Sequence, residues 1–195
     1  MEDFMNCINF IKERLNSKWK DSYSYEFTLT SSKKISPIEL QSIEDKFNIS
    51  FPNDYIQFVS EVGLCRLDAR WQGEGWPNTF FSMLTPEQII EILNAYKIWT
   101  DEHTYFDESD EDELEIKKVQ QSLRNNLIPF QYYGDETAWD FYCFVKHKIY
   151  KSNFQIIVAY HDDDELDLWF EGENSEKIWG FGQHIFNWIE TCKVR

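Results

Sequence analysis

The chain has 195 residues, a formal net charge of −16 and an aromatic content of 17%. A chain of this length can bury a sizeable core, and we expect residues 1–195 to form one domain. The negative charge disfavours nucleic acid and anionic lipid as partners and favours a basic protein. No apolar run reaches membrane-spanning length, the acidic N-terminus does not fit a signal peptide, and the four cysteines show no Cys-x-x-Cys spacing. We therefore expect a cytoplasmic protein with reduced thiols.

An N-terminal extension, about residues 1–34, precedes the more strongly patterned part of the chain. Apolar residues at helical spacing from Phe4 to Leu15 predict a first helix. The segment Tyr23 to Leu29 predicts a strand or an extended connection.

Two helices with explicit start signals follow directly. Ser36, Pro37 and Glu39 form a capping-box pattern, in which the serine caps the helix and proline takes the first helical position. A second start follows Pro52, and Gly63 is a suitable residue for the end of that helix.

The remainder of the chain predicts further helices and many strands around an acidic loop at about residues 101–115. Helices are expected at about residues 85–100, 115–126 and 175–192. Strands are expected at Leu64–Trp71, Thr79–Leu84, Leu127–Tyr132, Trp139–Lys146, Gln155–His161 and Leu166–Phe170. This order predicts an α+β fold with a mostly antiparallel sheet flanked by helices.

The ordered series of motifs resembles the SMI1/KNR4 (SUKH) superfamily. The series comprises the capped helix after Ile35, a Phe-Pro-x-Asp-Tyr step at 51–55, Gly-Trp-Pro at 75–77, Leu-Thr-Pro-Glu-Gln at 84–88, Ile-Pro-Phe at 128–130 and Phe-Asn-Trp-Ile at 186–189. It covers most of the chain from about Ile35 onward. One departure is Val62-Gly63-Leu64, where the family usually shows Asn-Gly-Gly. The resemblance implies an SMI1/KNR4-like fold and a non-enzymatic binding protein. Relatives are widely immunity proteins that bind and block a polymorphic bacterial toxin, often a nuclease.

Two other functions stay open beside the immunity interpretation. The resemblance to fungal cell-wall synthesis regulators allows a regulatory scaffold. Carboxylates near tryptophans, such as Glu74 beside Trp76 and Asp135 beside Trp139, also fit a carbohydrate-active enzyme. Metal sites are disfavoured, because the acidic loop lacks the glycine and register of a calcium loop and His161–Glu165 fits a polar turn. We therefore predict no catalytic residue, metal or cofactor.

For a cognate toxin domain as partner, we expect acidic residues at the rim to set the association rate and central aromatic residues to hold the complex. The candidate partner-binding residues lie on predicted turns and strand ends: Asp68, Trp71, Glu74, Trp76, Asp135, Glu136, Asp162, Asp163 and Asp164.

Overall fold

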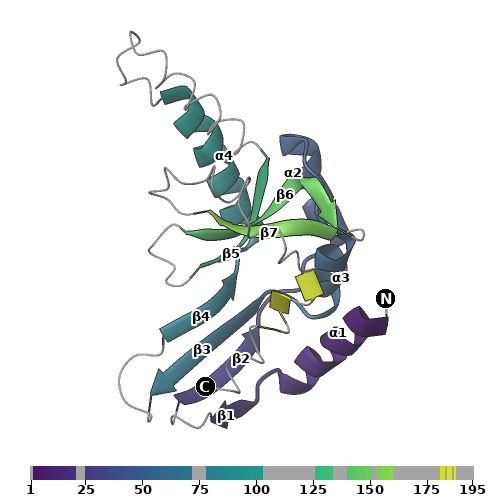
Figure 1. The fold of residues 1–195 in the computed structure, drawn as a ribbon, viewed down its shortest axis with the longest axis vertical. Coiled ribbons are helices and arrows are strands. Elements are labelled where there is room, and N and C mark those ends of the chain that lie inside the picture. Colours follow the sequence, from purple (N-terminus) through teal and green to yellow (C-terminus); the bar gives the residue numbers. More distant parts are fainter. Residues whose placement is uncertain are drawn as a thin grey trace.

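The computed structural model describes residues 2–20, 25–71, 78–102, 126–133, 140–150 and 153–159, together with positions 181, 182, 184, 185 and 187. Within these residues, seven strands form one antiparallel sheet in which each strand pairs with the next along the chain (Figure 1). The strands are β1 (Lys18–Lys20), β2 (Tyr25–Ser31), β3 (Cys65–Trp71), β4 (Asn78–Met83), β5 (Leu127–Tyr132), β6 (Phe141–Tyr150) and β7 (Asn153–Ala159). The helices are α1 (Glu2–Arg14), α2 (Pro37–Phe47), α3 (Asn53–Glu61) and α4 (Pro86–Glu102). The predicted α+β fold with an antiparallel sheet and flanking helices is confirmed.

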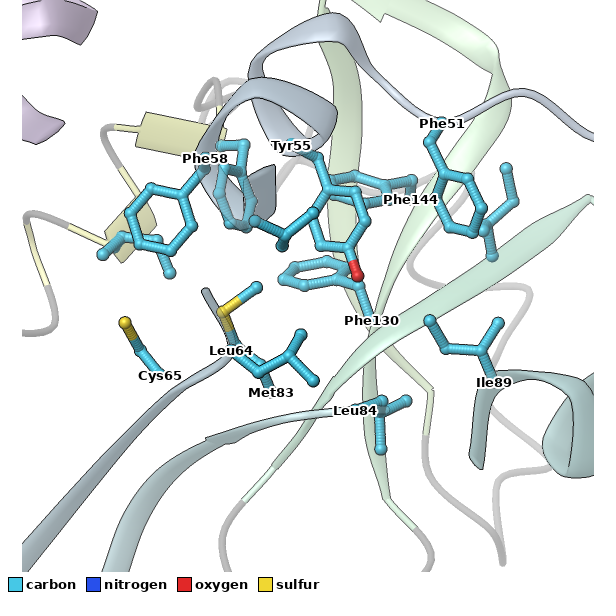
Figure 2. Packing of buried hydrophobic residues seen from close by; sticks show 14 of the residues in the cluster. Phe51, Tyr55, Phe58, Leu64, Cys65, Met83, Leu84, Ile89, Phe130 and Phe144 are labelled. Atoms are coloured by element: carbon cyan, nitrogen blue, oxygen red, sulfur yellow. The ribbon is translucent and has the colours of Figure 1, made fainter. Parts of the chain in front are cut away.

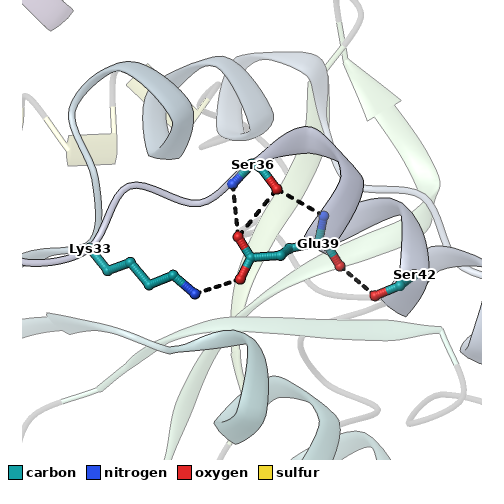
Figure 3. A network of polar contacts seen from close by, with 4 residues as sticks. All are labelled: Lys33, Ser36, Glu39 and Ser42. Atoms are coloured by element: carbon teal, nitrogen blue, oxygen red, sulfur yellow. Dashed lines mark hydrogen bonds and ion pairs between the residues drawn. The ribbon is translucent and has the colours of Figure 1, made fainter.

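The start of α2 is fixed by the predicted capping box (Figure 3). The backbone N–H of Glu39 donates to the Ser36 hydroxyl at 3.2 Å, and the backbone N–H of Ser36 donates to the Glu39 carboxylate at 3.2 Å. Lys33 forms an ion pair with the same carboxylate at 2.5 Å. The hydrogen bond from Lys33 holds the pKa of Glu39 below its usual range. The helix ends at Asn48, whose φ of 50° lies in the left-handed region that asparagine tolerates.

Helix α3 begins after Pro52 without a side-chain cap and ends just before Gly63. Gly63 has a φ of +100°, a conformation that residues with a Cβ rarely adopt. It lies against the end of β2, because a Cβ at this position would come within 2.6 Å of the Ser31 hydroxyl oxygen. The prediction that this glycine ends the helix therefore agrees with its backbone.

The core is formed where α3 packs on the sheet (Figure 2). Tyr55 of α3 makes edge-to-face contacts with Phe130 of β5, Phe144 of β6 and Phe181 of the C-terminal region, with ring centroids 6.1, 5.5 and 5.2 Å apart. Such aromatic pairs add stabilisation beyond the area that they bury. Burial also raises the pKa of the Tyr55 hydroxyl, so this residue stays neutral.

The N-terminal extension contributes more than the predicted helix. Ile8 and Ile11 of α1 are completely buried in the same core. β2 pairs with β3 from Tyr25↔Trp71 to Ser31↔Cys65, and the short strand β1 pairs with β2 in turn. The segment Tyr23–Leu29, expected to be a strand or an extended connection, is a strand over its described part and continues to Ser31, whereas β1 was not predicted.

Several predicted segments agree with the structure only in part or lie outside the described residues. Helix α4 continues to Glu102, so the first two positions of the expected acidic loop, 101 and 102, are helical. Phe181 and Ile185 of the expected closing helix are helical and buried. The rest of the acidic loop, the expected helix at 115–126 except its last residue, and the expected strand at 166–170 lie outside the described residues.

Candidate partner-binding surface

The predicted binding residues are described by the structure only at β3. Asp68 lies in the middle of this strand, and Trp71 is its last residue, with its backbone opposite Tyr25 of β2. The other candidates lie outside the described residues, so their mutual arrangement stays a prediction: Glu74, Trp76, Asp135, Glu136, Asp162, Asp163 and Asp164.

Asp68 belongs to a charged side of the sheet that faces away from the core. On β3, the core residues Leu67 and Ala69 are each 1% exposed, and they alternate with Arg66, Asp68 and Arg70. Because neighbouring side chains of a strand point to opposite faces, the three charged residues share one face. Register continues this face across the adjacent strands. We call the set the polar face and define it as Lys18, Lys20, Glu26, Thr28, Thr30, Arg66, Asp68, Arg70 and Thr79.

The Asp68 carboxylate is held in a small network on this face. Arg66 Nε donates to both carboxylate oxygens of Asp68, at 2.9 and 3.1 Å. The Thr79 hydroxyl donates to Asp68 Oδ1 at 3.0 Å and accepts from Arg66 Nη2 at 2.5 Å. A register irregularity between Leu67 and Asp68 sets Thr79 directly opposite Asp68. The network orients the carboxylate and offsets its charge, so Asp68 contributes little negative potential of its own.

The polar face carries a positive balance in an acidic protein. Lys18 forms an ion pair with Glu26 at 3.1 Å, and Arg66 with Asp68 at 2.9 Å. The side chains of Lys20 and Arg70 have no hydrogen bond or ion pair with any residue that the structure describes. Four cations therefore stand against two carboxylates, whereas the whole chain has a net charge of −16.

Sequence reasoning missed these cations because it selected acids and tryptophans. Their signal was present as alternation: Arg-x-Asp-x-Arg within CRLDARW, and Lys-x-Lys within KWK. Alternation of this kind marks residues that share one face of a strand.

A second polar group lies inside the core rather than on the surface. His184 Nε2 lies 2.9 Å from Gln131 Oε1, and the two residues are 6% and 0% exposed. The rings of Phe130 and Tyr142 contact the imidazole edge-to-face. Burial lowers the pKa of His184 to about 3, so the imidazole is neutral at physiological pH.

This buried pair ties the C-terminal helical segment to β5. Among the described residues, no group of three or more His, Cys, Asp or Glu side chains could hold a metal ion. The described thiols, Cys65 and Cys143, are buried, and burial raises the pKa of the Cys65 thiol to about 12. In the same part of the chain, no helix is both long enough and apolar enough to cross a membrane.

A family model matches residues 34–175, well over half of the chain, and its description is the SMI1 / KNR4 family (SUKH-1). The chain belongs to this family. Searches of curated proteins and of solved structures gave no significant match. By its family membership, the chain is an SMI1/KNR4 or immunity-like protein. Domains of this family are generally non-enzymatic binding domains. The matched range begins two residues before Ser36 and leaves α1, β1 and β2 outside it.

Proposed function

We propose that this protein is a non-enzymatic immunity protein that binds a cognate bacterial toxin domain and blocks its activity. The observation that carries the proposal is the match to the SMI1/KNR4 family over residues 34–175. The implied partner is a protein, and binding requires neither a cofactor nor a catalytic group. The cytoplasm is the compartment in which such a protein would meet an incoming toxin.

The net charge of −16 supports a basic toxin, such as a nuclease, as the partner. A nuclease needs basic side chains to hold phosphates, and an acidic protein steers such a surface toward itself from a distance. We assign this steering to Glu74, Asp135, Glu136 and the predicted turn at residues 162–164, and the central contacts to Trp71 and Trp76. We do not assign this steering to Asp68, because its carboxylate is already bound by Arg66 and Thr79.

The direct test is co-expression of this chain with the toxin domain encoded beside it. We expect cells to survive the toxin, and the purified proteins to form a tight complex that weakens as the salt concentration rises. Rescue without salt dependence would keep the immunity function and shift the mechanism from charge to aromatic packing. A chain that neither binds nor protects would overturn the proposal and favour a regulatory scaffold with a host protein as partner.

Matched variants separate the proposed site from general charge effects. The double variant Glu74→Gln/Asp135→Asn should slow association with the toxin, with most of the change in the on-rate. The control is Glu91→Gln together with Asp45→Asn, since both residues are exposed positions on α4 and α2 and the change in net charge is the same. Equal effects of the two pairs would show that only total charge matters.

A further inference from the structure

We infer that the polar face of β1–β4 is a second interaction surface, and that its occupant is a short acidic segment of a partner protein. The inference is independent of the toxin proposal, because it rests on the cations of the sheet. The observation behind it is the positive balance of this face, in which the side chains of Lys20 and Arg70 are exposed and have no partner among the described residues.

The two unpaired cations lie in one row across the sheet. Lys20 of β1 is opposite Glu26 of β2, and Glu26 is opposite Arg70 of β3. Two strand spacings separate Lys20 from Arg70, which is roughly 10 Å between their backbones. Glu26 pairs with Lys18 at 3.1 Å, so its carboxylate is engaged one row away. A carboxylate of a ligand bound over this row would have the Lys20 ammonium on one side and the Arg70 guanidinium on the other.

The neighbouring rows suit an acidic ligand as well. Thr28 of β2 lies between Lys18 of β1 and Asp68 of β3, and Thr30 lies opposite Arg66 of β3; both threonine side chains are half-buried. Arg66 is held by Asp68 and Thr79, so its guanidinium has a fixed position on the same face. Arginine recognises carboxylates with paired hydrogen bonds, which favours a carboxylate-bearing segment over an apolar one.

The overall charge favours a short acidic segment over nucleic acid. Charges farther away than about 8 Å are largely screened at physiological salt, so a few carboxylates docked on the polar face interact mainly with its cations. A nucleic acid extends well beyond this face and meets the repulsion of a molecule with a net charge of −16.

Protection of the sheet edge accounts for only part of the pattern. Lysines on a short edge strand prevent edge-to-edge association, and Lys18 and Lys20 on β1 are suited to that role. Arg70 is on β3, which pairs with β2 on one side and β4 on the other. A strand inside the sheet has no free edge to protect, so Arg70 calls for another explanation.

The experiment measures binding of a fluorescent synthetic peptide of alternating glutamate and glycine to the full chain at physiological ionic strength, where distant charges of the chain are screened. We expect saturable binding that weakens with salt, and no binding of a glycine-serine peptide of equal length. The double variant Lys20→Gln/Arg70→Gln should lose on the order of tenfold in affinity, as expected for two exposed charge pairs. The control Lys34→Gln/Lys46→Gln changes the net charge equally at exposed positions away from the face, and should change affinity less than about twofold.

Circular dichroism of each variant confirms that the fold is retained before affinities are compared. Equal losses in the two double variants, or no loss in either, would overturn the inference and leave edge protection as the role of the lysines. Tighter binding of a single-stranded oligonucleotide, lost in Lys20→Gln/Arg70→Gln, would replace the acidic segment by nucleic acid. Because no toxin is present, failure of this experiment is distinct from failure of the rescue experiment.

Discussion

At the scale of single residues, Gly63 is a position where the backbone tolerates little change. Its φ of +100° is strained for any residue with a Cβ, and that Cβ would also lie 3.0 Å from the carbonyl oxygen of Ser32. We expect Gly63→Ala to lower the free energy of unfolding by roughly 1–3 kcal/mol from backbone strain, measured by urea denaturation. In the double variant with Ser31→Ala, the closest contact is removed and the strain remains, so stability should recover only in part. An unchanged midpoint in Gly63→Ala would contradict this view of the turn.

His184 makes the stability of the protein sensitive to acid. Burial lowers its pKa from 6.5 to about 3, so between these values the unfolded chain binds a proton that the native chain does not. Stability is therefore fully present above about pH 6.5 and falls as the pH decreases toward 3. His184→Gln keeps an uncharged polar group near Gln131 and removes this titration.

Urea denaturation of both proteins between about pH 7.5 and 5 checks this pH dependence. We expect wild type to lose more stability than His184→Gln over this range, whatever their difference at neutral pH. Parallel stability curves would show that His184 is protonated equally in the native and unfolded states.

At the scale of an element, α2 depends on the cap at its first turn. Ser36→Ala removes the acceptor for the Glu39 N–H and should cost about 1 kcal/mol of stability, detectable as a lower melting temperature. Ser42→Ala is the control at an exposed position of the same helix, where the hydroxyl donates to a backbone carbonyl at 2.7 Å without capping the helix. We expect the control to stay within about 0.5 kcal/mol of wild type. Equal losses at both positions would argue against a specific capping effect.

The elements that sequence predicts best are those with local signals. Ser36 and Glu39 fix the start of α2 within four residues, and the structure shows both capping hydrogen bonds. β1 has only three residues, too few for a pattern, and it is defined by pairing with β2, where Trp19 stacks on Phe27 at 5.8 Å. Helix α4 passes its expected end, since the sequence from 87 to 128 holds no glycine or proline that would stop it.

At the scale of the whole molecule, the polar face was difficult to predict. Alternation shows that Arg66 and Arg70 share a face of one strand, and it carries no information on which strand lies beside them. The row of Lys20, Glu26 and Arg70 exists because β2 pairs with both β1 and β3, which are far apart in sequence. The positive charge of this face follows from which strands pair with one another. The composition of the chain would instead suggest a negative face, because its net charge is −16.

The packing of the two chain ends against each other gives the last prediction. Phe4 of α1 lies so close to Gly182 that a Cβ on the glycine would come within 2.4 Å of the phenylalanine ring. Both residues lie outside the range 34–175 matched by the family, yet Ile8 and Phe181 beside them are completely buried. We therefore expect Gly182→Ala to destabilise the protein by roughly 1–3 kcal/mol through overpacking, which urea denaturation measures.

A double-mutant cycle shows whether this loss arises at the contact between the ends. Phe4→Ala alone should destabilise by loss of packing, and it also makes room for the methyl group of Gly182→Ala. The double variant should therefore be more stable than the sum of the single effects implies, with a coupling of about 0.5–3 kcal/mol. Such coupling would mean that α1 and the C-terminal helix stabilise the family core together. Additive losses would mean that the cost of Gly182→Ala arises within the C-terminal segment, independently of α1.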